Sequence, residues 1–309
     1  MCLRPEVNRQ LEFQDQSRLN ASAAVVRAAL WISLLAIGLA SLLGAGAASA
    51  GALVEFPNLP KHTPANLSGY LARPDSGLSA ELDGALKYGP PFPAIVVLHG
   101  CNGMFGHSAV IADRLSSWGY VTLAVDSFGP RGFGIANRCG RGLPDQAFDA
   151  YAALRYLSQL DFVDPARVAV FGQSMGGETA LHAVDRDLAA QFFPERFRAA
   201  IAYYPYCDIP AATMTASTLI LIGEGDEQCP VERCREMVAH ARPEGAPIAL
   251  TAYPGVYHNF DVTLLTPGVR YRGFWLEYNE PAAKDAEEKT RAFLAAHLAE
   301  TSPGEPTAK

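Results

Sequence analysis

The 309-residue chain lacks the basic runs and the interleaved basic and aromatic residues that nucleic-acid-binding proteins carry. Its formal net charge is −7, so we expect no nucleic-acid partner. It contains no Cys-x2-Cys or His-x3-His pair, which argues against the common zinc motifs, and we expect neither a metal nor a cofactor. We find no internal repeat and no interdomain linker. The chain does have 49% hydrophobic residues, enough to build one large core.

Residues 1–50 differ in composition from the rest of the chain. Arg18 and Arg27 precede an apolar stretch over 28–43, and small residues then continue to Ala48-Ser49-Ala50. This order is typical of a cleaved secretory signal peptide. The apolar stretch is shorter than the ~20 residues that a membrane-spanning helix needs. We therefore expect an exported protein, periplasmic or secreted. An uncleaved anchor is the alternative, and only in that case would the protein contact a membrane.

Two further points concern this segment. The chain has no Arg-Arg pair, so nothing indicates export by the twin-arginine route. Glu6, Glu12 and Asp15 lie in the part that should be basic, which suggests a start codon downstream of Met1.

Between about residue 90 and residue 300, short apolar runs alternate with segments of helical periodicity. The expected strands are 94–98, 120–125, 168–171, 199–203, 218–222 and 248–253, and the expected helices are 108–118, 145–160, 175–184, 231–241 and 282–298. Most of the strand runs are continuously apolar, as in strands buried on both faces of a parallel sheet. The alternation predicts an α/β fold with a mostly parallel, doubly wound sheet, and ligands at the C-terminal ends of its strands.

The predicted core has simpler flanks. Residues 67–71 are expected to form an antiparallel edge strand, with 52–56 as its candidate partner. Residues 72–93 have the composition of a loop. The polar, proline-containing segment 301–309 is expected to be a disordered tail. The mature chain is thus predicted to be a single domain over 51–300.

The segment Gly172-Gln173-Ser174-Met175-Gly176 reads Gly-x-Ser-x-Gly. A short apolar run precedes it and a helical stretch follows it, which is the strand–turn–helix context of a nucleophile elbow. Ser174 is therefore the predicted nucleophile. The alternative is a glycine-rich turn in which Ser174 is only the N-cap of the following helix.

A serine hydroxyl needs a base to remove its proton, and the base needs an acid to orient it. In α/β-hydrolase chains these residues occur in the order serine, acid, histidine. His258 comes directly after the last predicted strand, at the same sheet edge as the elbow, and is the predicted base. The other histidines after Ser174 fall on predicted helices and are expected to be ordinary helix residues: His182, His240 and His297.

The acid is expected in the loop after the strand 218–222. Three carboxylates compete there. Asp226 is preferred because Gly225 before it permits a tight turn and because aspartate is the commoner orienting residue. Glu224 and Glu227 are the alternatives.

Acyl transfer also needs donors for the developing oxyanion. The backbone N–H of Met175, which follows the nucleophile, is one candidate. The second should come from the loop His99–Gly103, where the N–H of Cys101 is preferred over that of Asn102. His99 in the same loop is expected to brace it rather than to act as a second base.

The loop after the strand 120–125 is a candidate for substrate binding. Phe128 and Phe133 could wall an acyl pocket, and Arg131 could pair with a substrate carboxylate. The alternative is that Arg131 fixes its own loop through backbone carbonyls or an acid such as Asp126.

Five cysteines follow residue 50, and in an exported protein they could pair, leaving at least one free. Cys101 could pair with Cys139, and Cys207 with either Cys229 or Cys234.

Together these motifs resemble the dienelactone hydrolase family. The resemblance covers about residues 65–298 and rests on Leu98–Gly103, Asp126–Gly132, Phe171–Gly177, Gly223–Asp226 and Tyr253–Asp261. Several members use a cysteine nucleophile with Asp and His, and the dienelactone-cleaving type has a glutamate in the oxyanion loop. This chain has Ser174 in place of the cysteine and His99-Gly100 in the loop, as serine esterases do.

The resemblance implies the α/β-hydrolase fold and a Ser174–Asp226–His258 triad. With the motifs, it predicts a serine hydrolase for small carboxylic esters or lactones that acts through an acyl-enzyme. One alternative is a serine peptidase of the prolyl-oligopeptidase type, which shares the triad order. Another is a binding protein that kept the fold without activity. The specific substrate and the oligomeric state are left open.

Overall fold

The computed structural model describes residues 51–60, 62–74, 91–104, 106–133, 146–192 and 194–299. The predicted signal peptide, the C-terminal tail and Cys139 lie outside these residues, as does most of the loop predicted over 72–93.

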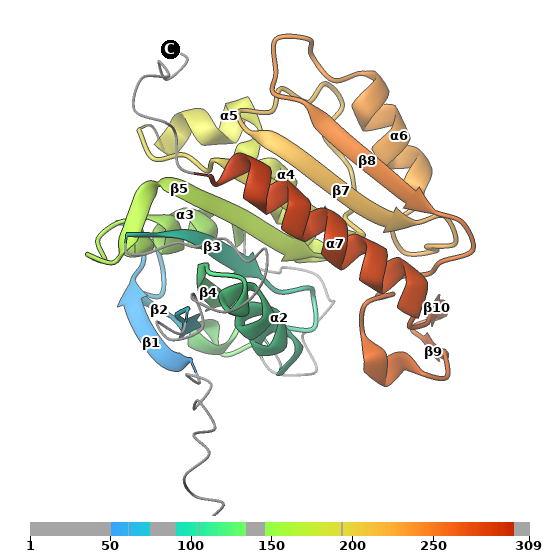
Figure 1. The fold of residues 1–309 in the computed structure, drawn as a ribbon, viewed down its shortest axis with the longest axis horizontal. Coiled ribbons are helices and arrows are strands. Elements are labelled where there is room, and N and C mark those ends of the chain that lie inside the picture. Colours follow the sequence, from blue (N-terminus) through green and yellow to red (C-terminus); the bar gives the residue numbers. More distant parts are fainter. Residues whose placement is uncertain are drawn as a thin grey trace, which may run out of the picture. The chain divides into compact units, whose positions relative to one another are not determined.

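The described chain is built on one eight-stranded sheet in the order β1-β2-β4-β3-β5-β6-β7-β8 (Figure 1). Its strands are β1 Ala52–Pro57, β2 Asn66–Ala72, β3 Phe92–Leu98, β4 Val121–Asp126, β5 Val163–Gln173, β6 Ala199–Tyr203, β7 Ser217–Gly223 and β8 Ile248–Tyr253. The strands from β4 through β8 in this order pair in parallel, and β1 and β2 are antiparallel. The predicted α/β class and parallel sheet are confirmed.

The first two strands differ from the prediction in one respect. β2 pairs with β1 as expected, with Leu67 opposite Phe56. However, β2 also pairs antiparallel with β4 through Ser68 and Asp126, so β1 and not β2 is the edge strand. The apolar side chains of Leu67 and Phe56 are both buried, which explains why this pair closes over the core.

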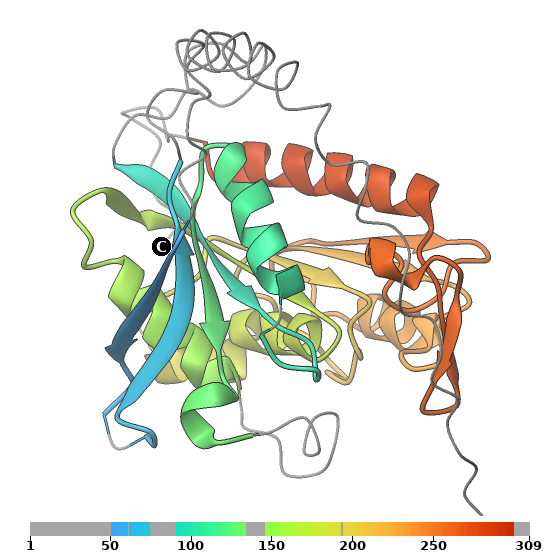
Figure 2. The ribbon, with the colours of Figure 1, turned by 90° about the horizontal axis from the view of Figure 1, so that it is seen from below.

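The helices lie on both faces of the sheet. They are α2 Gly106–Ser117, α3 Gln146–Leu157, α4 Met175–Val184, α5 Arg186–Ala189, α6 Val231–Ala239 and α7 Glu280–His297, with short 3-10 turns at Gly129–Arg131, Ala190–Phe192 and Thr263–Leu265. Figure 2 shows α2 and α7 on one face and α3, α4 and α6 on the other. Right-handed crossovers place α2 on the opposite face from α3, α4 and α6, because the chain moves from β3 to β4 in one direction and from β4 onward in the other.

That change of direction determines where a ligand can bind. β3 lies between β4 and β5, so the loops after β3 and β5 leave the sheet toward opposite faces. A crevice opens between such loops at the C-terminal ends of the strands. The loop 99–103 follows β3 and Ser174 follows β5, so both flank this crevice.

One supersecondary element was not expected. β9 Val269–Tyr271 and β10 Phe274–Leu276 form an antiparallel hairpin between β8 and α7. Its strands are too short for a period-2 pattern to be recognised in sequence. Among the residues that the structure describes, no helix has the length and apolar character needed to cross a membrane.

Candidate active site

Ser174 occupies the sharp turn between β5 and α4. Its backbone is strained, with φ 52° and ψ −119°, a conformation that serine rarely adopts. The turn is possible because Gly172 lies against Gly176, where a Cβ on Gly172 would come within 1.9 Å of the Gly176 carbonyl oxygen. The Ser174 side chain makes no capping hydrogen bond to α4, so the N-cap alternative does not fit.

A chain of hydrogen bonds joins Ser174, His258 and Asp226. His258 Nδ1 lies 2.6 Å from Asp226 Oδ2, and His258 Nε2 lies 3.0 Å from Ser174 Oγ. The carboxylate only accepts, so Nδ1 carries the proton and Nε2 is left to accept the hydroxyl proton of Ser174. Both His258 and Asp226 are buried, which shields the hydrogen bond between them from water.

The second oxygen of Asp226 is also held in place. Its Oδ1 accepts the backbone N–H groups of Gln228 at 2.9 Å and Cys229 at 2.8 Å. The two competing acids point elsewhere. Glu224 forms an exposed ion pair with Arg235, and Glu227 accepts the N–H of Trp275 at 3.1 Å. Of the three carboxylates, Asp226 is therefore the one that the loop directs at His258.

The four histidines that were predicted to be structural, His99, His182, His240 and His297, all make contacts away from Ser174. His99 is buried and bridges two loops: its Nδ1 donates to the Gly100 carbonyl at 2.7 Å, and its Nε2 accepts the Ser127 N–H at 3.2 Å. It thus braces the loop after β3. His182 pairs with Asp208, His240 bonds the Glu236 carbonyl, and His297 contacts Phe293.

A cavity of about 170 Å³ opens over Ser174. It is lined by Gly100, Cys101, Asn102, Gly103, His107, Ser108, Gln173, Ser174, Tyr204, Gln228, His258, Asn259, Val262, Tyr271 and Leu276. The loop that carries the two candidates for the second oxyanion donor, Cys101 and Asn102, thus faces the nucleophile. Met175, the other candidate, is the first residue of α4, directly after it.

The substrate-binding interpretation of Arg131 and Phe128 does not fit the structure. Arg131 makes two 2.8 Å bonds to the fully buried carboxylate of Asp149 and a third to the Ser127 carbonyl. Phe128 is buried against His99 and Phe133. Neither residue is among those that line the cavity. Arg131 fixes its loop through a backbone carbonyl, that of Ser127, and an acid, as the alternative held, but the acid is Asp149 instead of Asp126.

Sequence reasoning missed a buried polar network beside the nucleophile. Gln173 Nε2 lies 2.6 Å from Asp261, 2.8 Å from the Tyr204 hydroxyl and 3.0 Å from His107 Nε2. The Tyr204 hydroxyl donates to Asp261 at 2.7 Å, and burial followed by the charge of Asp261 raises the pKa of Tyr204, which keeps this proton in place. Gln173 and Asp261 both stood in recognised motifs. Their packing partner Tyr204 gave no sequence signal.

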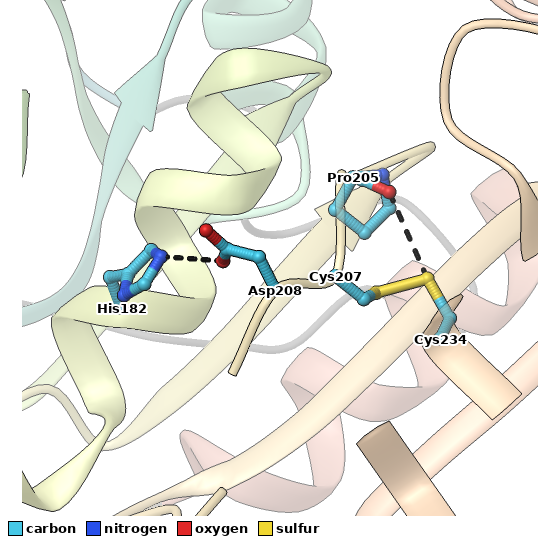
Figure 3. Close-up of a disulfide and its surroundings, with 5 residues drawn as sticks. All are labelled: His182, Pro205, Cys207, Asp208 and Cys234. Atoms are coloured by element: carbon cyan, nitrogen blue, oxygen red, sulfur yellow. Dashed lines mark hydrogen bonds and ion pairs between the residues drawn. A yellow bond between two sulfur atoms is a disulfide. The ribbon is translucent and has the colours of Figure 1, made fainter. Parts of the chain in front are cut away.

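The disulfide between Cys207 and Cys234 joins the segment after β6 to α6, with a Cα–Cα distance of 4.9 Å (Figure 3). Cys234 is thus the partner of Cys207, and Cys229 is free and buried. Cys101 is also disulfide-bonded, whereas Cys139, its predicted partner, lies outside the described residues.

Within the part of the chain that the structure describes, two clusters could supply several ligands to a metal ion, and we assign a metal to neither. Asp226, His258 and Cys229 form the first. Asp226 and His258 are already bonded to each other. Burial raises the pKa of Cys229, which keeps its thiol protonated and makes it a poor metal ligand. In the second, His182 and Asp208 form an exposed ion pair beside Glu178 (Figure 3).

Comparison with known proteins places this geometry in context. An uncharacterized protein of Mycobacterium tuberculosis is 31% identical over 187 residues, which cover 54% of this chain and 63% of that protein. The match therefore spans less than two thirds of the relative's length.

Solved structures share the fold. A dienelactone hydrolase-like promiscuous phosphotriesterase, P91, from metagenomic libraries superposes with a TM-score of 0.61 at 19% identity, covering 81% of this chain and 100% of that one. Thermogutta terrifontis esterase 2, phosphorylated by paraoxon, gives a TM-score of 0.57 at 20% identity, covering 82% and 97%. The family model for dienelactone hydrolases matches residues 84–298. The chain therefore belongs to the dienelactone hydrolase family and has the α/β-hydrolase fold.

Proposed function

We propose that the protein is an exported serine hydrolase that cleaves small carboxylic esters or lactones through an acyl-enzyme. One observation carries this proposal: the unbroken chain of hydrogen bonds from Asp226 through His258 to Ser174, which ends at a cavity. A buried carboxylate that orients a histidine, which in turn contacts a strained serine, is the arrangement that activates a hydroxyl nucleophile.

The reaction follows from these contacts. His258 Nε2 removes the proton of Ser174 Oγ as the oxygen attacks the substrate carbonyl carbon. The N–H groups of Met175 and Cys101 stabilise the oxyanion, and Asp226 stabilises the imidazolium. As the tetrahedral intermediate collapses, His258 gives the proton to the leaving alcohol oxygen. Water, deprotonated by His258, then attacks the acyl carbon. As the bond between that carbon and Ser174 Oγ breaks, His258 returns the proton to Ser174 Oγ and the carboxylic acid leaves.

The size of the cavity favours small substrates, since about 170 Å³ is below the usual range for drug-sized ligands. The fold neighbours support ester chemistry, because one of them is named as an esterase and another as a promiscuous phosphotriesterase.

Two observations support export. Residues 1–50 contain the basic, apolar and small-residue segments of a signal peptide in the expected order, and the Cys207–Cys234 bond supports export because disulfides persist in oxidising compartments. N-terminal sequencing of the protein recovered from the periplasm or medium checks this. Export with cleavage predicts a first residue near Gly51, whereas a chain retained in the membrane with residues 28–43 intact would contradict it.

Replacement of Ser174 tests the nucleophile. Ser174→Ala should lower kcat for p-nitrophenyl acetate by about 10⁴-fold or more, because no other group can form the acyl-enzyme. It should also abolish labelling by a fluorophosphonate probe. A variant that kept most of its turnover would refute the assignment. A panel of short esters, lactones, acetylated sugars and peptides, run on the unaltered protein, separates an esterase from a peptidase.

A matched pair of carboxyl-to-amide changes tests the acid. Asp226→Asn should lower kcat by about 10³–10⁴-fold, because the amide no longer stabilises the proton on His258 Nδ1. Glu224→Gln in the same loop is the control, since it removes only an exposed ion pair with Arg235 and should leave kcat within about twofold. Equal effects of the two changes in steady-state assays would contradict the role of Asp226.

A further inference from the structure

One face of the β9–β10 hairpin is apolar apart from the hydroxyl group of Tyr271. In the antiparallel pair, Val269 lies opposite Leu276 and Tyr271 lies opposite Phe274. Directly opposed residues, and residues two apart along a strand, share a face, so these four side chains lie together. Trp275 is on the other face, where its indole lies over Gly268 and contacts the ring of Tyr257.

Two of the four side chains line the cavity over Ser174, and three of the four are exposed. Tyr271 and Leu276 belong to the cavity wall. Val269 is 43% exposed, Tyr271 is 40% exposed and Phe274 is 38% exposed. Of the six large hydrophobic residues that are exposed in the described parts of the chain, four lie between Leu264 and Phe274. Such a concentration beside a cavity indicates a binding surface.

The hairpin is fixed to the loops that carry the acid and the base. Leu276 forms a parallel bridge with His258, and the Trp275 N–H donates to Glu227, the neighbour of Asp226. Figure 1 shows the hairpin on the β8 side of the sheet, next to the start of α7. The apolar face is therefore held at the side of the cavity where His258 lies.

The chemistry at His258 indicates which part of a substrate meets this face. His258 Nε2 must reach the leaving oxygen to protonate it, so the alcohol part of an ester lies on the His258 side. We propose that the apolar face of Val269, Tyr271, Phe274 and Leu276 binds an apolar alcohol group of the substrate and extends the binding site beyond the cavity. The inference rests on the proposed ester hydrolysis and gives it a substrate class: esters of apolar alcohols.

Two ester series and one double variant test the inference. The first series is ethyl, butyl, hexyl and octyl acetate; the second consists of p-nitrophenyl esters of acetate, butyrate, hexanoate and octanoate. Burying one methylene is worth up to about fourfold in kcat/KM. In the unaltered protein, kcat/KM should therefore rise along the alcohol series. In Val269→Ser/Phe274→Ser, octyl acetate should lose roughly tenfold relative to ethyl acetate. Both side chains are partly exposed, so the fold should tolerate the change.

The control is Leu53→Ser, which removes an exposed leucine (79%) from β1, at the opposite edge of the sheet from β8. Its kcat/KM values should match those of the unaltered protein in both series. The inference is overturned if the double variant loses equally on all acetates, or if its loss follows acyl length instead.

Other occupants of the apolar face give other results. If the double variant changes from dimer to monomer with no effect along the alcohol series, the face binds a second copy of the chain. If it loses binding to lipid vesicles with no such effect, the face binds a lipid surface. Either result overturns the inference. If the unaltered protein hydrolyses ethyl and p-nitrophenyl acetate but the loss of kcat/KM in the double variant does not depend on alcohol length, only this inference fails. If it hydrolyses no ester, the proposed function fails with it.

Discussion

At the scale of single residues, burial separates side chains that support the site from those that act in it. Arg131 and Asp149 illustrate the first kind: the arginine is 16% exposed and the carboxylate is fully buried. A carboxylate that is buried away from water needs an oppositely charged partner. Arg131 is the partner of Asp149 and is therefore not available for a substrate. Asp226 is buried as well, but its partner His258 continues the chain to Ser174.

The role of Arg131 predicts a loss of stability. Arg131→Ala leaves the Asp149 charge buried and unpaired and should lower the free energy of unfolding by about 3–5 kcal/mol in urea titrations. Arg155→Ala is the matched control, because its pair with Glu195 is much more exposed and should be worth at most about 1 kcal/mol. The kcat/KM values for neutral and anionic esters should change in the same proportion in Arg131→Ala. A selective loss for anionic esters would restore the substrate-pairing interpretation.

At the scale of elements, the strand–turn–helix unit β5–Ser174–α4 is determined by close packing as much as by hydrogen bonds. Gly172 and Gly176 let the end of β5 approach the first turn of α4 closely. The Ser174 N–H is satisfied by the Tyr203 carbonyl of β6 at 2.9 Å, which fixes the elbow to the neighbouring strand. The strained serine is thus held from two sides.

The packing at Gly172 predicts a severe effect of a small substitution. In Gly172→Ala, the added methyl group would meet backbone atoms of Gly176 at 1.9 and 2.2 Å, and backbone cannot move aside as a flexible side chain can. We expect a loss of about 3 kcal/mol or more of stability, with loss of esterase activity in the fraction that folds. Thermal unfolding and p-nitrophenyl acetate assays measure both. A melting temperature close to that of the unaltered protein would contradict this packing.

At the scale of the described molecule, residues far apart in sequence meet at one edge of the sheet. The cavity is built from loops after β3, β5, β6, β7 and β8 together with the hairpin. The Cys207–Cys234 disulfide ties the segment after β6 to α6, which follows the loop of Asp226. It restrains two of the five loops on which the site depends, those after β6 and β7.

Removal of this disulfide should weaken the fold. The two cysteines are 27 residues apart, and closing a loop of that length is worth about 3–4 kcal/mol in chain-entropy terms. Cys207→Ala/Cys234→Ala should therefore reduce the free energy of unfolding by about that amount in urea. The free energy of unfolding of the single variant Cys207→Ala should be no higher than that of the double variant. A loss below about 1 kcal/mol would show that the bond contributes little to stability.

Much of the fold could be predicted because its signals are local. The bounds of β6, β8 and α4 agree with the predicted segments to the residue, since a continuous apolar run or a glycine-flanked helix start is visible in a short window. The positions of Ser174, Asp226 and His258 followed from the same logic, because each comes directly after a strand that can be recognised.

The sequence by itself determined the α/β class and the family, and it predicted Ser174, Asp226 and His258, in this order, as the proposed triad. The tertiary structure alone decided that Arg131 faces Asp149, that Cys207 joins Cys234 and not Cys229, and that Gln173, Tyr204 and Asp261 bond beside Ser174. It also revealed the apolar face of the hairpin next to His258. These contacts join residues 18 to 88 positions apart, and no local pattern specifies them, because they depend on how the crossovers bring separate loops to one edge of the sheet.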